Sequence, residues 1–416
     1  MEQNNAWQVR CRGENSAPEA RSAFDEICRE GAQRMLQEAI AAEVEDYIER
    51  HAAKCDPATG HRAVVRNGFL PEREILSPAG PLAVKQPRVR DTREGTKFTS
   101  AILPPYMRKS PSLEALIPTL YLKGISTNDF PEALAAILGA GAKGLSAGTI
   151  VRLKESWEQD YQNWLKRDLT GKRYVYFWAD GVYFNVRLSD ERPCVLVIVG
   201  ALADGTKELV ALVDGERESA LSWKELLLEL KRRGLEAGPQ VAVGDGALGF
   251  WAALDEVFPV CRRQRCWVHK EANVLDKMPK SLQPAAKALL HRMYQAATKA
   301  EALAVYADFL ALYGAKCPKA CACLEKDKEQ LFTFYDFPAE HWGHLRTANP
   351  VESAFSTVRH RHRQTKGSGS RATTLAMAHQ LLLQAERHWR KLNHYELVAK
   401  VLSGVKFTDG VEKEAA

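Results

Sequence analysis

The chain has 416 residues, of which 45% are hydrophobic and 26% are charged, so its composition is that of a globular protein rather than a disordered or collagen-like one. At roughly 150 residues per domain, the length predicts two or three domains. The apolar stretch Val195–Ala203 is too short to span a bilayer, and Met1–Ala20 lacks an apolar signal segment. We therefore expect a protein that is neither embedded in a membrane nor exported.

Nine cysteines, an odd number, are spread over the whole chain instead of forming a dense disulfide framework. This distribution predicts a reducing, cytoplasmic location. The net charge of +6 is small for this length, but Cys261–Lys270 and Thr357–Lys366 carry many cations and no acid. Local basic segments of this kind indicate contact with a polyanion.

The first 170 residues predict a mainly helical region that contains a small β element. Apolar positions recur at helical spacing from Ser22 to about His51, which predicts a long amphipathic helix. Between residues 61 and 90, short β-like runs are separated by Asn67-Gly68 and by Pro78-Ala79-Gly80. These runs predict a small antiparallel sheet or hairpin.

Three further helices are expected over Leu113–Leu122, Asn128–Leu138 and Ser146–Trp164. Their short connections are compatible with a helix-turn-helix unit whose third helix would carry Arg152 and Lys154. The alternative is a plain packing role, which short helices have in many helical bundles.

Residues 171–272 predict alternating strands and helices. Three runs rich in β-branched and aromatic residues, Arg173–Arg187, Pro193–Ala203 and Lys207–Val213, predict consecutive antiparallel strands with a hairpin turn at Asp204-Gly205. They are followed by a helix over Ala220–Arg233, a strand over Gln240–Val243, a helix over Leu248–Phe258 and a basic strand over Val260–Val268. The order β-β-β-α-β-α-β is that of a ribonuclease H-like core, an analogy at the level of the fold alone.

The last part of the chain predicts helices only. Residues 273–343 are rich in alanine and predict an all-helical insertion, after which residues 344–400 are expected to return to the core. One helix should begin at Pro350, with Asn349 as its N-cap, and end near Lys366. A final amphipathic helix should cover Ala372–Trp389.

Three acidic residues stand at positions suited to chemistry: Asp180 in the first strand, Asp245 at the end of the fourth, and Glu352 in the first turn of a helix. Each has a structural alternative, because Asp-Gly pairs often form turns and a glutamate in a first turn often caps its helix. In a ribonuclease H-like sheet, however, the first and fourth strands are neighbours. The three carboxylates would then form a site for two Mg²⁺ or Mn²⁺ ions, an arrangement suited to phosphoryl transfer.

The helix that begins near Glu352 also carries a row of cations. Arg359, Arg363 and Lys366 follow at seven, eleven and fourteen positions, within about 40° of the Glu352 direction on a helix. The shared face carries no further acid, so we expect it to contact a phosphate backbone.

Cys266 and His269 form a Cys-x₂-His pair. Zinc ligation would need more ligands, and the thiols within Cys317–Cys323 are the only cluster that could supply them. A buried cysteine beside a hydrogen-bonded histidine is the simpler interpretation. Trp267 is either a platform for an unpaired or flipped base or a core residue.

Taken in order, these segments resemble the Mutator family of transposases, the DDE-type enzymes of bacterial insertion sequences. The motifs that carry the resemblance are Arg66-Asn67-Gly68, Gln86–Asp91, Tyr121–Ser126, the Asp180-Gly181 strand, Val243–Gly246, Cys266–His269 and Leu345–Glu352. The resemblance implies a ribonuclease H-like core with a helical insertion, and a catalytic triad of Asp180, Asp245 and Glu352.

The resemblance also implies an activity. Such an enzyme binds the terminal inverted repeats of its element through the N-terminal region, cleaves the element ends and joins the 3′-hydroxyl to target DNA with two Mg²⁺ or Mn²⁺ ions. Arg346, Arg359, Arg363, Lys366 and Trp267 are the predicted DNA contacts, and Cys266 and His269 match the family's Cys-x₂-His element.

Two element ends must be brought together, so a homodimer or larger assembly in the bacterial cytoplasm is expected. Two alternatives stay open: a catalytically silent or domesticated protein that only occupies inverted repeats, and a ribonuclease H-like nuclease or resolvase that cuts without joining.

Overall fold

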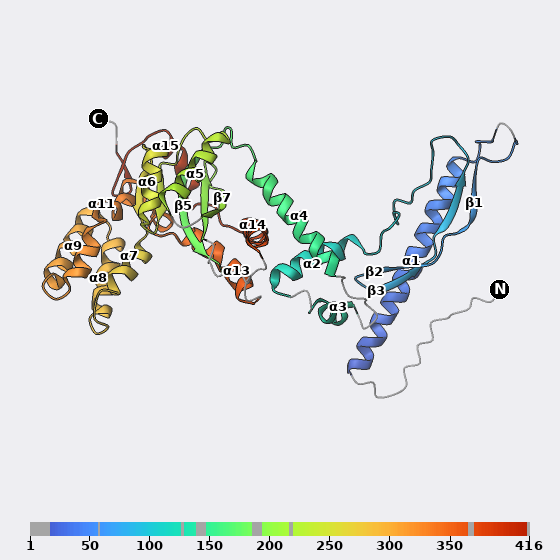
Figure 1. Cartoon of the computed structure of the whole chain (residues 1–416), viewed down its shortest axis with the longest axis horizontal. Coiled ribbons are helices and arrows are strands. Elements are labelled where there is room, and N and C mark those ends of the chain that lie inside the picture. The colour runs from blue at the N-terminus through green and yellow to red at the C-terminus, as the bar shows by residue number, and fades with distance from the viewer. Residues whose placement is uncertain are drawn as a thin grey trace. The chain divides into compact units, whose positions relative to one another are not determined.

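The computed structural model describes residues 17–56, 59–125, 129–138, 147–184, 194–215, 219–364 and 370–413 (Figure 1). The chain divides into two compact units, Met1–Ile150 and Val151–Ala416. Each unit has its own apolar core, which is small in the first unit and large in the second. Within the described ranges, no helix combines the length and the apolar composition that crossing a membrane requires.

The first unit is organised around one long helix. Helix α1 (Ala17–Arg50) begins before the predicted start at Ser22, and its residues Ile40 and Val44 are fully buried. Four short strands follow it: β1 (Val64–Phe69), β2 (Arg73–Ser77), β3 (Gly80–Val84) and β4 (Pro87–Asp91). Helix α1 packs against β1, β3 and β4. The strands form two separate antiparallel pairs, β1 with β4 and β2 with β3.

Asn67-Gly68 does not separate two strands as predicted, because the pair lies inside β1. The register of β1 against β4 shifts between Arg66 and Phe69, and Gly68 has a φ of 70°. A residue without a side chain accepts this backbone conformation, so the pair forms a bulge. The predicted turn before Gly80 is confirmed, and it joins β2 to β3.

The three predicted short helices are confirmed as α2 (Pro111–Lys123), α3 (Phe130–Leu138) and α4 (Ala147–Leu165). The hydroxyl of Ser110 accepts a hydrogen bond from the first turn of α2, and Gly124 ends this helix with a φ of 121°. Arg152 and Lys154 lie on α4 as predicted. Their role in reading DNA stays a prediction.

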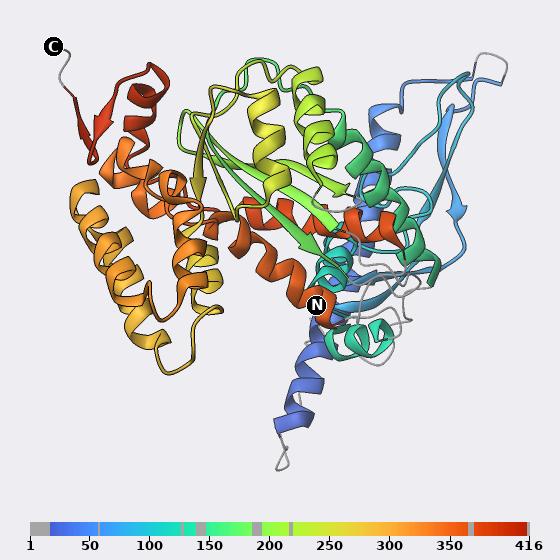
Figure 2. The same cartoon turned by 60° about the vertical axis from the view of Figure 1, so that its left-hand side comes forward.

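A five-stranded mixed sheet forms the centre of the second unit (Figure 2). Its strands are β5 (Tyr174–Tyr183), β6 (Cys194–Leu202), β7 (Lys207–Gly215), β8 (Val241–Gly244) and β9 (Arg262–Arg265), in the spatial order β7-β6-β5-β8-β9. Strands β5, β6 and β7 are antiparallel neighbours, whereas β8 and β9 run parallel to β5. The predicted mixed α/β class is therefore confirmed.

Strand β9 is shorter than the predicted basic strand. Helix α7 (Trp267–Leu275) begins immediately after it, so Trp267 and Val268 are helical. The two helices between the strands, α5 (Ala220–Arg232) and α6 (Leu248–Val257), lie where the sequence predicted them.

One face of the sheet forms the main apolar core. Successive residues of a strand point to opposite faces, so Phe177 and Ala179 of β5 share a face. They pack with Trp223 of α5 and Leu254 of α6 in one buried cluster. These two helices cover this face of the sheet (Figure 2).

The other face carries polar contacts to a distant part of the chain. Tyr176, Trp178 and Asp180 alternate with the core residues of β5 and point to this side. The Tyr176 hydroxyl is hydrogen-bonded to His341 Nδ1 at 2.7 Å, and the Trp178 indole donates to the carbonyl oxygen of His344 at 2.8 Å. The segment that leads into helix α13 (Asn349–Gln364) therefore lies on this face, and α13 itself packs against β5 and β6.

The remaining elements are mostly helical, as predicted. Between β9 and α13 they are α7, α8 (Gln283–Gln295), α9 (Lys299–Tyr313), α10 (Pro318–Glu325), α11 (Lys328–Leu331), η1 (Thr333–Asp336), η2 (Ala339–His341) and α12 (Trp342–Leu345). After α13 come α14 (Arg371–Glu386), η3 (Tyr395–Leu397), α15 (Val398–Leu402), β10 (Phe407–Thr408) and β11 (Val411–Glu412). Helix α14 packs against β7.

We expect Gly200→Ala, a buried position in β6, to destabilise the second unit by about 1–3 kcal/mol. An added Cβ would lie 2.5 Å from the Tyr174 ring and 2.6 Å from a methyl group of Val210, well inside van der Waals contact. The shift of the urea unfolding midpoint measures the effect. Gly343→Ala is the control, because its new Cβ would meet nothing within 4 Å. Equal shifts for the two variants would contradict the packing argument.

Candidate active site

Asp180 lies in the interior of strand β5, where it pairs with Val197 of β6. The alternative interpretation of Asp180-Gly181 as a turn is therefore wrong. The residue is only 8% exposed. Because a buried carboxylate loses its hydration, hydrogen bonds or cations around it must offset that loss.

Asp245 follows strand β8 directly, and the strand register brings it level with Asp180. Strands β5 and β8 are parallel, with Trp178 opposite Val243, and the two aspartates are each two residues further along. Residues at the same level of parallel strands point to the same face. Asp245 Oδ1 also accepts a hydrogen bond from the amide of Ala247 at 2.8 Å, so the turn interpretation is correct here. A carboxylate has two oxygens, so a turn and a ligand role are compatible.

Glu352 lies in the first turn of α13. Val351, Phe355 and Val358 form the buried side of this helix and are at most 1% exposed. The amides of Val351 and Glu352 donate to the carbonyl oxygen of Ala348 at 3.0 and 3.1 Å, so the helix begins one residue earlier than predicted. The buried Oε1 of Glu352 has no hydrogen-bond partner among the described residues, so this oxygen plays no part in capping the helix.

Three hydrogen bonds at Cys266 and Trp267 connect the segments around these acids. The Cys266 amide donates to the carbonyl oxygen of Gly244 at 2.8 Å, and the Trp267 amide donates to that of Arg346 at 2.9 Å. The amide of Ala348 donates to the Cys266 sulfur at 3.2 Å. We call these three bonds the Cys266 junction. It fastens the end of β8, the start of α7 and the entry to α13 to one another.

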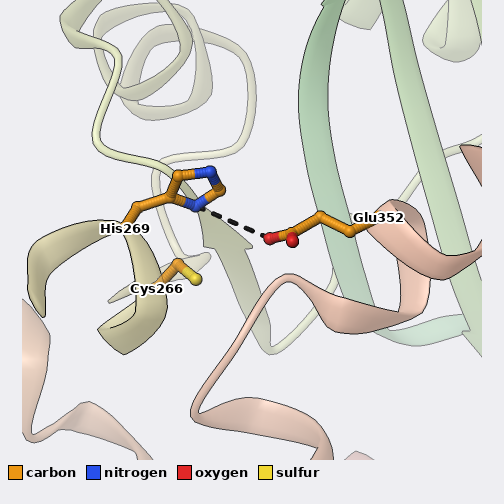
Figure 3. A group of neighbouring side chains, drawn as sticks. All are labelled: Cys266, His269 and Glu352. Carbon is orange, nitrogen blue, oxygen red and sulfur yellow. Dashed lines mark ion pairs between the residues drawn. The ribbon is translucent and has the colours of Figure 1, made fainter. Parts of the chain in front are cut away.

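Cys266, His269 and Glu352 bring three potential metal ligands together (Figure 3). The cysteine sulfur, a histidine ring nitrogen and a carboxylate oxygen lie within 4.8 Å of one another. His269 Nδ1 and Glu352 Oε1 are 3.7 Å apart, too far for a hydrogen bond, and both are buried without a hydrogen-bond partner in the described part of the chain. Burial raises the pKa of the Cys266 thiol, and the charge of Glu352 adds to this effect.

The structure brings the three acids to one region without closing them into a single cluster. Asp180, inside β5, and Asp245, directly after β8, lie at the same level, and Glu352 comes from a helix packed on the same sheet. The Glu352 carboxylate faces His269 instead (Figure 3). Among the described residues, the one group of close ligand atoms contains Glu352 and neither aspartate.

The zinc site considered from the sequence, with ligands from Cys317–Cys323, is not assembled. The close group around Cys266 and His269 contains no other cysteine in the ranges that the structure describes. Cys317 and Cys321 are instead buried at the start and in the middle of α10.

The predicted DNA contacts differ in their exposure. Arg359 and Arg363 are exposed on α13, and Lys366 lies outside the described residues. Arg346 is partly buried, with its guanidinium over two aromatic rings at 4.9 and 5.2 Å, and burial lowers its pKa. Arg359 and Arg363 are therefore the better candidates for contact with a phosphate.

Trp267 is a core residue, so its predicted contact with a base is wrong. The side chain is fully buried, and its indole nitrogen donates to the carbonyl oxygen of Leu331 at 2.8 Å. The ring packs against Tyr294 and Phe332. The ring therefore has no exposed surface on which a base could stack.

Four cations of Cys261–Lys270 are paired with acids outside this segment, so it is not the open basic patch that we predicted. The pairs are Arg262 with Asp336, Arg263 with Asp255, and both Arg265 and Lys270 with Asp327. The side chains of Arg265 and Lys270 are 4% and 2% exposed. Asp327 was not identified from the sequence, because nothing local distinguishes it from other acids in the helical segment.

Comparison with known proteins identifies the family of this chain. The family model described as "Transposase, Mutator family" matches residues 8–391, almost the whole chain. The chain belongs to the Mutator family of transposases. The resemblance found from the sequence motifs is therefore confirmed.

Relatives from this family align with most of the chain. It is 51% identical over 298 residues to the transposase for insertion sequence element IS6120 of Mycolicibacterium smegmatis, a match covering 72% of this chain and 92% of that protein. It is 48% identical to the transposase for element IST2 of Acidithiobacillus ferrooxidans, which covers 67% of this chain and 95% of that one. A more distant relative, the transposase for element ISRM5 of Rhizobium meliloti, is 27% identical and covers 88% and 89% of the two chains.

We expect Asp327→Asn to lower the free energy of unfolding of the second unit by about 3–5 kcal/mol, because it leaves two buried cations without their acid. Chemical denaturation followed by circular dichroism measures the loss. Glu256→Gln is the control: its partner Lys224 is 37% exposed and Glu256 is 59% exposed, so its loss should stay below about 1 kcal/mol. A similar small loss for both variants would show that the buried pairs contribute little.

Proposed function

We propose that this chain is a DNA transposase that cuts DNA at the ends of an insertion sequence and joins the freed 3′-hydroxyl to target DNA. The observation that carries the proposal is the convergence of Asp180, Asp245 and Glu352 on one region of the central sheet. The names of the relatives support it, since they are transposases for insertion sequence elements.

The proposed fold of the second unit is a ribonuclease H-like core, formed by residues 171–272 and 344–400, with residues 273–343 as a helical insertion. The order β7-β6-β5-β8-β9 supports this fold, because β5 has an antiparallel neighbour on one side and a parallel neighbour on the other. In such a core the first and fourth strands are adjacent, which accounts for the position of Asp180 and Asp245 at the same level of the sheet.

Two Mg²⁺ or Mn²⁺ ions fit the proposed site. Carboxylate oxygens are the ligands that these cations prefer. A nearby cation would be attracted by these carboxylates, and it would bind Glu352 Oε1, which has no hydrogen-bond partner among the described residues. When bound, the ions supply activation of the attacking water or hydroxyl and stabilisation of the leaving oxygen.

The protein's own part is to position the ligands and the DNA. Pairing with β6 fixes the backbone of Asp180, and the hydrogen bond from the amide of Ala247 orients the carboxylate of Asp245. Glu352 would complete the set if its carboxylate turned from His269 toward the two aspartates. Arg359 and Arg363 are exposed further along the same helix and would bind phosphate groups.

The proposed partners are the terminal inverted repeats and the target, both double-stranded DNA. Residues 1–170, with the helices α2, α3 and α4, would bind the repeats, and the exposed Arg152 on α4 is one candidate contact. Two ends must react together, so we propose a homodimer or a larger assembly on DNA.

We expect Asp180→Asn, Asp245→Asn and Glu352→Gln each to bind end DNA and to lose cutting and joining by more than roughly 1,000-fold, because each removes an ion ligand. The measurement is nicking and joining of a supercoiled plasmid that carries the DNA flanking the gene, with Mg²⁺ or Mn²⁺. Asp204→Asn is the control, since it changes another Asp-Gly pair in the exposed turn between β6 and β7.

Each alternative has its own outcome in this assay. Wild-type protein that binds the ends and never cuts them is a silent inverted-repeat-binding protein. Cutting without any joined product indicates a nuclease or resolvase. Full activity of any of the three variants would contradict the assignment of that residue.

We expect Arg359→Ala together with Arg363→Ala to weaken DNA binding and to reduce the slope of log affinity against log salt by about 1.8, because each arginine would neutralise one phosphate. Fluorescence anisotropy of a duplex from the element end, at several salt concentrations, measures the slope. Arg263→Ala is the control, because Asp255 already pairs with Arg263. An unchanged slope in the double variant would remove α13 from the DNA interface.

A further inference from the structure

We propose that Cys266, His269 and Glu352 form a binding site for one transition-metal ion such as Zn²⁺. This site is distinct from the proposed Mg²⁺ site, although the two share Glu352. The three donor atoms lie within 4.8 Å of one another, in the one such group that the described residues contain. Figure 3 shows the three side chains converging from the start of α7 and the start of α13.

The donor set determines which ion the site would take. A cysteine sulfur and an imidazole nitrogen are ligands for Zn²⁺ and similar ions, whereas Mg²⁺ prefers oxygen ligands alone. Three protein ligands complete a tetrahedral site with one position for water, the form common to zinc sites that remain accessible to solvent. His269 and Glu352 are 35% and 27% exposed, so solvent reaches the group from one side.

The distances are close to those that a bound ion requires. An ion with tetrahedral bonds of about 2.1 Å to nitrogen and oxygen separates these two atoms by about 3.4 Å. His269 Nδ1 and Glu352 Oε1 are 3.7 Å apart. Both atoms are buried and have no hydrogen-bond partner in the described ranges, which is rare for buried polar atoms. One cation between them would satisfy both.

The site is held together before any ion binds. The Cys266 junction attaches the cysteine to the entry of α13, through the amide of Ala348, so Cys266 and Glu352 are kept close by hydrogen bonds. His269 is three residues after Cys266 in the first turn of α7, a spacing that puts both on one side of the helix. A preformed site binds an ion without first ordering the chain.

Metal binding by the full-length protein, without DNA, tests this proposal independently of the proposed function. We expect one Zn²⁺ or Co²⁺ per chain, and a thiolate-to-metal charge-transfer band in the near ultraviolet with Co²⁺. Cys266→Ser, His269→Gln and Glu352→Gln should each weaken binding by roughly 100-fold or more, and Cys266→Ser should also remove the band. Cys323→Ser is the control, a partly buried thiol outside the group.

Circular dichroism must show that each variant is folded, and Zn²⁺ should raise the unfolding temperature of the wild type more than that of the three ligand variants. Failure of the wild type to bind Zn²⁺ or Co²⁺ would overturn the proposal and leave His269 as an ion-pair partner that orients Glu352. A charge-transfer band that survives in Cys266→Ser would also overturn it, because another thiol would then be the ligand.

The sharing of Glu352 has a consequence that does rest on the proposed function. An ion on Cys266 and His269 keeps the carboxylate away from the aspartates, so Zn²⁺ should inhibit Mg²⁺-supported DNA cutting. The measurement is the Zn²⁺ concentration that halves DNA cutting, with the activity of each protein expressed relative to its own activity without Zn²⁺. This concentration should be higher for Cys266→Ser than for the wild type. Equal sensitivity would contradict the sharing of Glu352, even if Zn²⁺ binding itself is observed.

Discussion

The Cys266 junction is the constraint on which the candidate site depends. Its three hydrogen bonds use the main chain of Cys266 and Trp267 and the cysteine sulfur, and they connect a strand end, a helix start and the entry to another helix. The acids themselves come from segments far apart in sequence. Strand pairing aligns Asp180 with Asp245, and the junction ties the entry to α13, which carries Glu352, to the end of β8.

Much of the second unit could be predicted because its signals are local. The hairpin at Asp204-Gly205 depends on neighbouring residues, and it is present. The alignment of Asp180 with Asp245 was expected by analogy with a ribonuclease H-like sheet, which the order of strands and helices suggested. Prediction was weaker for dipeptides that occur in more than one structure. Asp-Gly is part of a strand at Asp180-Gly181 and forms a turn at Asp245-Gly246, and Asn67-Gly68 forms a bulge instead of the expected break between strands.

The remaining errors involve contacts between distant segments. Arg265 and Lys270 look like part of a basic patch in the sequence, but Asp327, in the turn between α10 and α11, neutralises both. Trp267 stands among basic residues in the sequence, where its ring could stack on a base. The helix that starts at this residue instead directs the ring into the core. No local pattern specifies that Glu352 faces His269, because this orientation is set by how α7 and α13 meet.

The hydrogen bond between Trp267 and Arg346 joins the two ends of the helical segment that runs from α7 to α12. A chain segment whose ends are fastened together can gain or lose residues without moving the structure to which it is attached. The ends of this segment therefore stay together even if a connection between two of its helices is lengthened. An insertion into such a connection should leave the sheet and its acids in place only if it spares Asp327 and Phe332, which contact buried residues at the end of β9 and the start of α7.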